Sequence, residues 1–197
     1  MEGAIKSLPE ISITRVPGEE WGTIDLKRFD AVVFSGGFSN AQAASIGEAG
    51  RNNVREYIRN GGGYVGVCAG AYLACSNFTW SLGILHASTV SRKWERGRGF
   101  MDVEISEEGR PLLGDVKGTF KVRYNNGPII KPAERTDLPP YTPLAFFRSE
   151  ISEHGAPAGI MVNSPSQASG TFGKGRVFIS SPHPENTPGV QNFITRA

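Results

Sequence analysis

The segment from Gly61 to Cys75, GGGYVGVCAGAYLAC, constrains the fold of this chain more than any other part of it. Its apolar run Tyr64–Cys68 suits a strand that is buried on both faces, and small, helix-compatible residues follow at once. The cysteine at the junction lies between Gly66 and Gly70, as in the thiol form of the nucleophile elbow. The sequence therefore predicts a strand that turns abruptly into a helix and presents a thiol at the turn.

Strand and helix patterns alternate around this segment. Asp30–Ser35 is another buried-strand candidate, and Ala43–Asn60 has apolar residues at helical spacing. This alternation predicts βαβ units and an α/β fold with a doubly wound, mostly parallel sheet. Ile11–Val16 alternates as a half-buried strand would. Two late strands are expected at Ala158–Val162 and Arg176–Ser180, and a short helix at 188–197.

The middle of the chain has a different character. Short strand-like runs are separated by loops rich in glycine and proline, which indicates an antiparallel or mixed extension of the same sheet. The expected strands are Ile84–Val90, Phe100–Ile105, Thr119–Tyr124 and Leu144–Phe147. Because no linker is evident, residues 1–197 are interpreted as a single domain.

Composition excludes several classes of protein. With 25 glycines and 13 prolines in 197 residues and 39% hydrophobic residues, the chain suits neither a helical bundle nor a disordered segment. A net charge of +2 gives no broad footprint for nucleic acid, and the basic residues Arg92, Lys93, Arg96 and Arg98 are interpreted as a solvated loop. No membrane-spanning run or signal peptide is present, so we expect a cytoplasmic protein without a membrane partner.

The two cysteines, Cys68 and Cys75, require separate explanations. On one helix they would lie about 10 Å apart along the axis, too far for a disulfide. Their spacing matches no zinc motif, and we expect no metal and no cofactor. Cys75 is expected to be a buried structural thiol. Cys68 is either a nucleophile, favoured by the helix that begins after it, or a small buried hydrophobic residue.

A thiol nucleophile needs a base, and His183 is the best candidate. It follows the predicted strand Arg176–Ser180 within the tripeptide His-Pro-Glu, and Glu185 could accept a hydrogen bond from it and fix its tautomer. An ordinary proline-rich turn is the alternative interpretation. His86 is placed in the core or on the surface, and His154 in an exposed turn.

A third element could stabilise an oxyanion. The strand at 30–35 ends in Ser35-Gly36-Gly37, where glycines let backbone N–H groups point into a cleft. The N–H of Ala69, directly after the thiol, would supply the second donor. A plain loop is again the alternative.

Together these elements resemble the class I glutamine amidotransferase-like superfamily, in which a strand ending in two glycines, a G-x-C-x-G elbow and a late H-P-E tripeptide recur. The resemblance is greatest to the branch related to the amino-terminal domain of biotin–protein ligases, and it runs from about residue 24 to residue 187. The motifs that carry it are Gly61–Gly63, Gly66–Tyr72, Tyr124–Pro128 and Ser180–Glu185.

The resemblance implies a flavodoxin-like sheet and a triad in which Cys68 is the nucleophile, His183 the base and Glu185 its orienting group. It also implies that Gly37 and Ala69 donate to the oxyanion. Two departures stand out: Ser35 replaces the usual proline, and the strand with which such proteins usually begin is absent. An unpaired strand edge at the amino terminus would invite formation of a homodimer.

Two functions fit these observations. The first is a thiol amidohydrolase that attacks a small amide such as glutamine through a thioester, with a separate synthetase or ligase partner to use the ammonia. The second is a ligand-binding or protein-binding regulatory module of the biotin–protein ligase type. In either case Gly36, Tyr124, Asn125 and Asn126 are candidates for the substrate pocket, although the last three also suit an Asn-Gly turn between strands. Direct biotin ligation is poorly supported, because no nucleotide-binding loop with a basic cluster is present.

Overall fold

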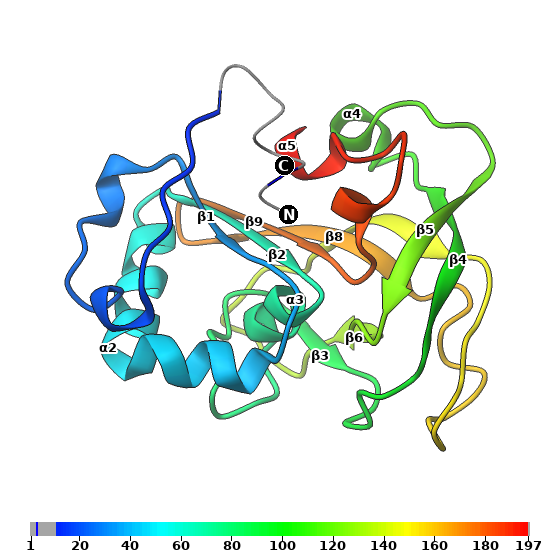
Figure 1. Cartoon of the computed structure of the whole chain (residues 1–197), viewed down its shortest axis with the longest axis horizontal. Coiled ribbons are helices and arrows are strands. Elements are labelled where there is room, and N and C mark those ends of the chain that lie inside the picture. Colours follow the sequence, from blue (N-terminus) through cyan, green and yellow to red (C-terminus); the bar gives the residue numbers. More distant parts are fainter. Residues whose placement is uncertain (1–2, 4–10, 197) are drawn as a thin grey trace.

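A seven-stranded sheet forms the centre of the molecule in the computed structural model, which describes residue 3 and residues 11–196 (Figure 1). Its strand order is β1-β2-β9-β8-β7-β4-β5. The strands are β1 Ala31–Phe34, β2 Gly63–Val67, β4 Arg98–Ile105, β5 Thr119–Asn125, β7 Thr142–Phe147, β8 Pro165–Phe172 and β9 Gly175–Ser180. A separate antiparallel pair consists of β3 Ala87–Thr89 and β6 Ile130–Pro132.

The sheet has a parallel part and an antiparallel part. β1 pairs parallel with β2, and β2 pairs parallel with β9. The remaining pairs, β9 with β8, β8 with β7, β7 with β4 and β4 with β5, are antiparallel. The predicted α/β class with an antiparallel extension is confirmed, and the extension supplies the four strands beyond β9.

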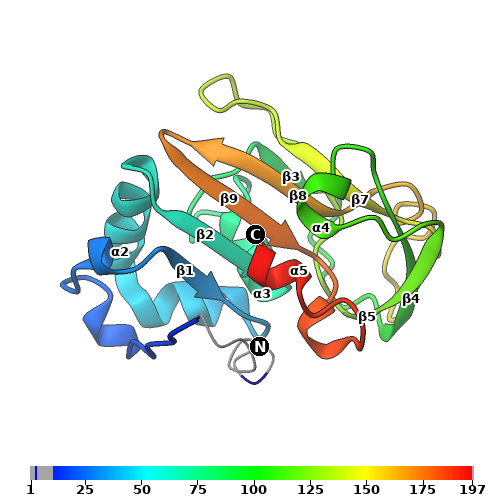
Figure 2. The same ribbon diagram turned by 90° about the horizontal axis from the view of Figure 1, so that it is seen from above.

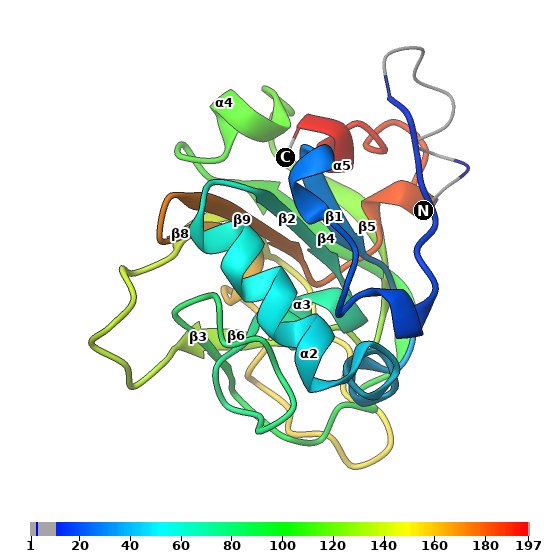
Figure 3. The same ribbon diagram turned by 90° about the vertical axis from the view of Figure 1, so that its left-hand side faces the viewer.

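Helices cover both faces of this sheet (Figures 1 and 3). α2 and α3 lie on one face together with the β3–β6 pair, whereas α4 and α5 lie on the other. The helices are α2 Ser39–Arg59, α3 Ala69–Ala74, α4 Arg110–Leu113 and α5 Phe193–Arg196, and short 3-10 turns occupy η1 Gly18–Glu20, η2 Leu26–Arg28 and η3 Pro184–Asn186. Among the residues described, no helix is long and apolar enough to cross a membrane.

Side chains of the central strands alternate between two hydrophobic cores. Tyr64 of β2 packs in the core beneath α2 and α3, while its neighbour Val65 packs in the core beneath α4 and α5. In β9, Ile179 belongs to the first core and Phe178 to the second. A strand buried in this way has a continuous apolar sequence, which is why the β2 and β9 segments could be recognised from the sequence.

The sheet curls so that its far edge returns toward the parallel strands (Figure 2). The backbone N–H of His183, just after β9, donates to the carbonyl of Arg123 in β5 at 2.7 Å. The thiol of Cys68, just after β2, lies against Asn125 at the end of β5. Strands that are distant in the sheet order therefore converge at the carboxyl ends of β1, β2 and β9.

Two predicted strands are wrong. Ile11–Val16 has no regular structure, because no described strand lies beside it to take up its backbone hydrogen bonds. Residues 11–30 contain no strand, and within the described chain β1 pairs only with β2, so the first strand that is usual in the superfamily this sequence resembles has no counterpart there. Ala158–Val162 forms turns instead of a strand.

The short β6 and the polar β8 were missed, since neither has an apolar run.

Candidate active site

Cys68 occupies a strained turn between β2 and α3. Its φ of 53° and ψ of −99° place it in a region that residues other than glycine rarely adopt, at a cost of ~1–3 kcal/mol. Its N–H donates to the carbonyl of Ser180 at 2.8 Å, which fixes the turn to β9. The elbow glycine Gly70 is required by close packing, because a Cβ there would lie 2.1 Å from the carbonyl oxygen of Phe34.

His183 and Glu185 form a buried pair on the segment that follows β9. The imidazole Nδ1 and the carboxylate Oε1 lie 2.8 Å apart, and both side chains are at least nine-tenths buried. The hydroxyl of Thr187 donates to the carbonyl of His183 and accepts from the N–H of Arg123, which ties this segment to β5. Burial works to lower the pKa of His183, but Cys68 and Glu185 outweigh it and raise that pKa to about 9.

The thiol and the imidazole are neighbours without a hydrogen bond between them. Cys68 Sγ donates to the carbonyl of Asn125 at 3.3 Å, and Nε2 of His183 is buried without a hydrogen-bond partner in the described chain. Cys68 is nevertheless close enough to be the main group that favours the charged imidazole. Unliganded active sites often show such loose contacts, which tighten when substrate binds.

Gly36 and Gly37 lie beside the imidazole at the end of β1. A Cβ on Gly36 would come 2.7 Å from Cε1 of His183, so only glycine leaves the ring in its place. Gly37 has a φ of 141°, which favours glycine. Neither its N–H nor that of Ala69 donates a hydrogen bond within the described residues.

One cleft of about 690 Å³ unites most of the residues singled out in the sequence. Those that line it are Gly36, Gly37, Cys68, Asn125, Asn126, His183 and Glu185. Two predicted residues lie elsewhere. Ala69 is buried at the start of α3, and Tyr124 is fully buried below the cleft, where its hydroxyl donates to the carbonyl of Gly127 at 2.7 Å. Tyr124 therefore supports the Asn125-Asn126 turn and is not part of the cleft lining.

Sequence reasoning missed the aromatic and cationic part of the lining. It comprises Phe38, Tyr72, Phe78, Trp80, Arg92, Trp94 and Arg98. The only available signal was the mixture of basic and aromatic residues at 92–98, which was interpreted as a solvated loop. That loop is indeed largely exposed, but it forms one wall of the cleft.

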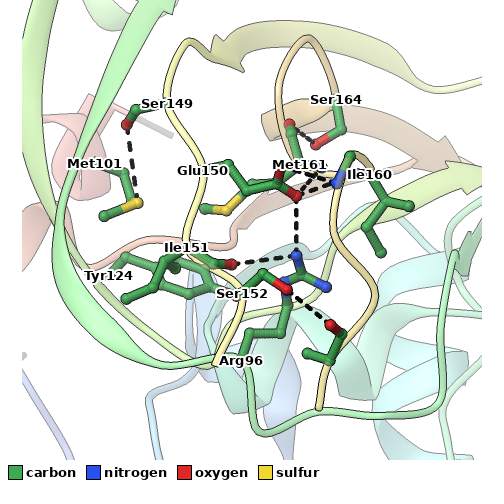
Figure 4. A network of polar contacts seen from close by, with 12 residues as sticks. Arg96, Met101, Tyr124, Ser149, Glu150, Ile151, Ser152, Ile160, Met161 and Ser164 are labelled. Carbon is green, nitrogen blue, oxygen red and sulfur yellow. Dashed lines mark hydrogen bonds and ion pairs between the residues drawn. The ribbon is translucent and has the colours of Figure 1, made fainter. Parts of the chain in front are cut away.

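Polar contacts of Asn126 and Arg96 hold this wall in place. Figure 4 shows the contacts of Arg96. The side-chain oxygen of Asn126 accepts from the N–H groups of Arg96 and Gly97 at 2.9 and 2.8 Å. The guanidinium of Arg96, 2% exposed, pairs with Glu150 at 3.3 Å. The same carboxylate accepts from the N–H groups of residues 159–161, which explains why that segment turns instead of forming a strand.

The other histidines and the second cysteine lie outside the cleft. Burial raises the pKa of the Cys75 thiol to about 12, and Sγ donates to the carbonyl of Ala71 at 3.3 Å. In the part of the chain that the structure describes, no group of three or more His, Cys, Asp or Glu side chains is arranged to hold a metal ion.

Comparison with known proteins agrees with this architecture. Residues 10–93 match the family described as "Biotin-protein ligase, N terminal", a segment that includes the Gly36-Gly37 turn and Cys68 but not His183 or Glu185. No curated protein sequence matches the chain significantly.

Solved structures share the fold at low sequence identity. A glutamine amidotransferase matches with a TM-score of 0.64 and 20% identity over 99% of this chain and 90% of its own. The cytoplasmic protein STM3548 from Salmonella typhimurium matches with a TM-score of 0.60 and 15% identity over 98% and 78%. PurLQS from Thermotoga maritima matches with a TM-score of 0.62 and 13% identity over 88% and 81%. The predicted resemblance in fold to the glutamine amidotransferases is confirmed, and so is the resemblance of residues 10–93 to the biotin–protein ligase amino-terminal family.

Proposed function

We propose that this chain is a thiol amidohydrolase. It has the fold of the glutamine amidotransferases, and residues 10–93 match the biotin–protein ligase amino-terminal family. The observation that carries this proposal is the meeting of three elements in one cleft: the strained thiol of Cys68, the buried His183–Glu185 pair and the Gly36-Gly37 turn. Each element arises from a different strand end, and each has the chemistry that cleavage of an amide requires.

In the proposed acylation, the thiolate of Cys68 attacks the carbonyl carbon of a primary amide. The resulting oxyanion accepts from the free N–H groups of Gly37 and Ala69. His183, whose raised pKa keeps it protonated near neutral pH, gives a proton to the departing nitrogen as the C–N bond breaks. The products of this step are ammonia and a thioester on Cys68.

In the proposed deacylation, the neutral imidazole takes a proton from water, and the hydroxide attacks the thioester carbonyl. The C–S bond then breaks, the carboxylic acid leaves and the thiolate of Cys68 is regenerated beside the protonated imidazole. Glu185 accepts from Nδ1 throughout and keeps Nε2 directed at the reacting groups. If glutamine is the substrate, use of the ammonia requires a separate synthetase or ligase partner.

A second candidate is a binding or regulatory module. It is favoured by the family match over residues 10–93. It is also favoured by the hydrogen bond from Sγ of Cys68 to the Asn125 carbonyl, because the thiol then makes no hydrogen bond to His183. In this function the same cleft would hold a small ligand without converting it.

Labelling with a glutamine-mimicking electrophile, 6-diazo-5-oxo-norleucine, distinguishes the amidohydrolase from the binding module. Peptide mass spectrometry should find Cys68 modified at least about tenfold faster than free cysteine, and His183→Gln or Glu185→Gln should slow the reaction by about the same factor. Cys75, fully buried, is the internal control and should stay unmodified. If Cys68 reacts no faster than free cysteine, glutamine is excluded as the substrate. If iodoacetamide, which mimics only the amide group, also reacts with Cys68 no faster than with free cysteine, the amidohydrolase is excluded and the binding module stands.

A further inference from the structure

Aromatic side chains form an extended wall in the cleft beyond the thiol. The rings of Phe78 and Trp80 stack with centroids 4.6 Å apart, and Tyr72 meets Phe78 edge-on at 6.3 Å. Phe38 and Trp94 meet edge-on at 5.9 Å and are 66% and 43% exposed. Open aromatic surface in a concave site stacks well on planar groups, because both surfaces lose contact with water and their π-systems are complementary.

Two guanidinium groups in the same lining have no partner. Arg92 and Arg98 both face solvent, and within residues 11–196 no ion pair, hydrogen bond or ring contact engages either side chain. The single acidic residue of the lining is Glu185, which is already paired with His183. The cleft therefore has uncompensated positive charge that an anionic group would balance.

The cleft is also larger than an amino-acid amide needs. Its volume of about 690 Å³ falls within the ~300–1,000 Å³ typical of sites for drug-sized ligands. The backbone of its Arg-Trp wall is held by Asn126, which binds the N–H groups of Arg96 and Gly97, and by the pair of the buried Arg96 with the half-buried Glu150, so the loop itself needs little ordering when a ligand binds.

We infer that the substrate is an amide of a compound that carries a planar ring and an anionic oxygen group. The ring stacks on the aromatic wall, and the anion lies between Arg92 and Arg98 while the amide carbonyl reaches Cys68. This inference rests on the proposed amide hydrolysis, and it replaces glutamine by a larger substrate class. The anion is a carboxylate or a phosphate, which the guanidinium groups bind in similar ways.

Ligand binding to the Cys68→Ala chain tests the inference without turnover. The probes are 4-carbamoylbenzoate (ring, amide and carboxylate), benzamide (no anion) and succinamate (no ring). The affinity for each probe is measured by calorimetry and by the fluorescence of the cleft tryptophans. We expect 4-carbamoylbenzoate to bind at least about tenfold more tightly than either of the others. 4-Carbamoylphenyl phosphate in the same assay decides between the two anions.

Matched variants assign the contacts. In the Cys68→Ala background, Arg92→Gln, Arg98→Gln and Trp80→Leu should each weaken 4-carbamoylbenzoate binding by about fivefold. Lys93→Gln removes an exposed charge from the same loop outside the cleft lining and should leave binding unchanged. The arginines are exposed, so their variants are expected to fold.

The outcomes separate this inference from the proposed function. Equal affinity for the three probes, no binding of 4-carbamoylbenzoate, or equal effects of the Arg92, Arg98 and Lys93 substitutions would overturn the substrate class. Selective binding by the Cys68→Ala chain without any ammonia release by the wild-type chain would instead overturn amide hydrolysis and leave the ligand class in place.

Discussion

The raised pKa of His183 makes stability depend on pH in a direction that can be measured. The imidazole titrates at about 9 in the folded chain against 6.5 for an unperturbed histidine, because Cys68 and Glu185 favour its charged form more than burial disfavours it. The folded state thus binds the proton more tightly than the unfolded state does. The resulting stabilisation is fully present below pH 6.5 and is lost as the pH rises through 9.

The magnitude follows from the difference between these two pKa values. At about 1.4 kcal/mol per pH unit, the contribution of His183 to the free energy of unfolding is at most ~3.5 kcal/mol. Removing Glu185 should reduce it, since that carboxylate accounts for part of the rise in pKa. Replacing His183 with Gln removes the titration altogether.

Urea unfolding at pH 6, 7, 8 and 9 under reducing conditions measures this contribution. Between pH 6 and pH 9 the wild-type chain should lose up to ~3 kcal/mol more stability than the His183→Gln chain. Glu185→Gln should give an intermediate loss. Equal losses in wild type and His183→Gln would refute the assigned environment of the imidazole.

Three further predictions concern the packing of the site. Gly36→Ala places a Cβ 2.7 Å from Cε1 of His183 and displaces the ring, so labelling of Cys68 should slow by about tenfold while Cys75 stays unlabelled, a combination that an unfolded chain would not show. Gly70→Ala drives a Cβ against the backbone carbonyl of Phe34 and should lower the free energy of unfolding by about 2 kcal/mol in urea titrations; an unchanged midpoint would contradict the close approach. Glu150→Gln leaves the buried Arg96 without its counter-charge and should lower the free energy of unfolding by about 2 kcal/mol. Glu104→Gln, in the exposed pair with Arg148, should lower it by less than about 0.5 kcal/mol, and equal losses would refute the role of the Arg96–Glu150 pair.

The parallel half of the fold could be predicted because its local and global signals agree. β2 is buried on both faces and has a continuous apolar sequence. Gly66 and Gly70, on either side of Cys68, must be glycine because a Cβ at either position would lie within 3 Å of a backbone oxygen atom. The predicted strand at Ile11–Val16 had the right alternation, but a strand also needs a neighbour, which no local pattern reveals. β8 was missed because its pairing with β7 and β9, rather than its small polar residues, makes it a strand.

In the cleft, too, the features with a local sequence signal could be predicted and those that depend on distant contacts could not. The elbow, the Gly36-Gly37 turn and the His-Pro-Glu segment could be found, since each is a local motif at a strand end. The wall of Trp80, Arg92 and Trp94 could not, because it exists only after the sheet curls and Asn126 and Glu150 hold the loop against the site. Exposed loop residues have no local signal that distinguishes a cleft wall from a solvated turn.

The acyl intermediate on Cys68 tests the central proposal most directly. The chain is mixed with glutamine or 4-carbamoylbenzoate, quenched in acid and digested, and the mass of the Cys68 peptide is measured while ammonia release is followed in parallel. The proposal predicts an adduct with the mass of the acyl group on Cys68, together with ammonia release that is abolished in the Cys68→Ser chain. Ammonia release at the wild-type rate by Cys68→Ser, or release with no adduct on Cys68 at any quench time, would contradict it.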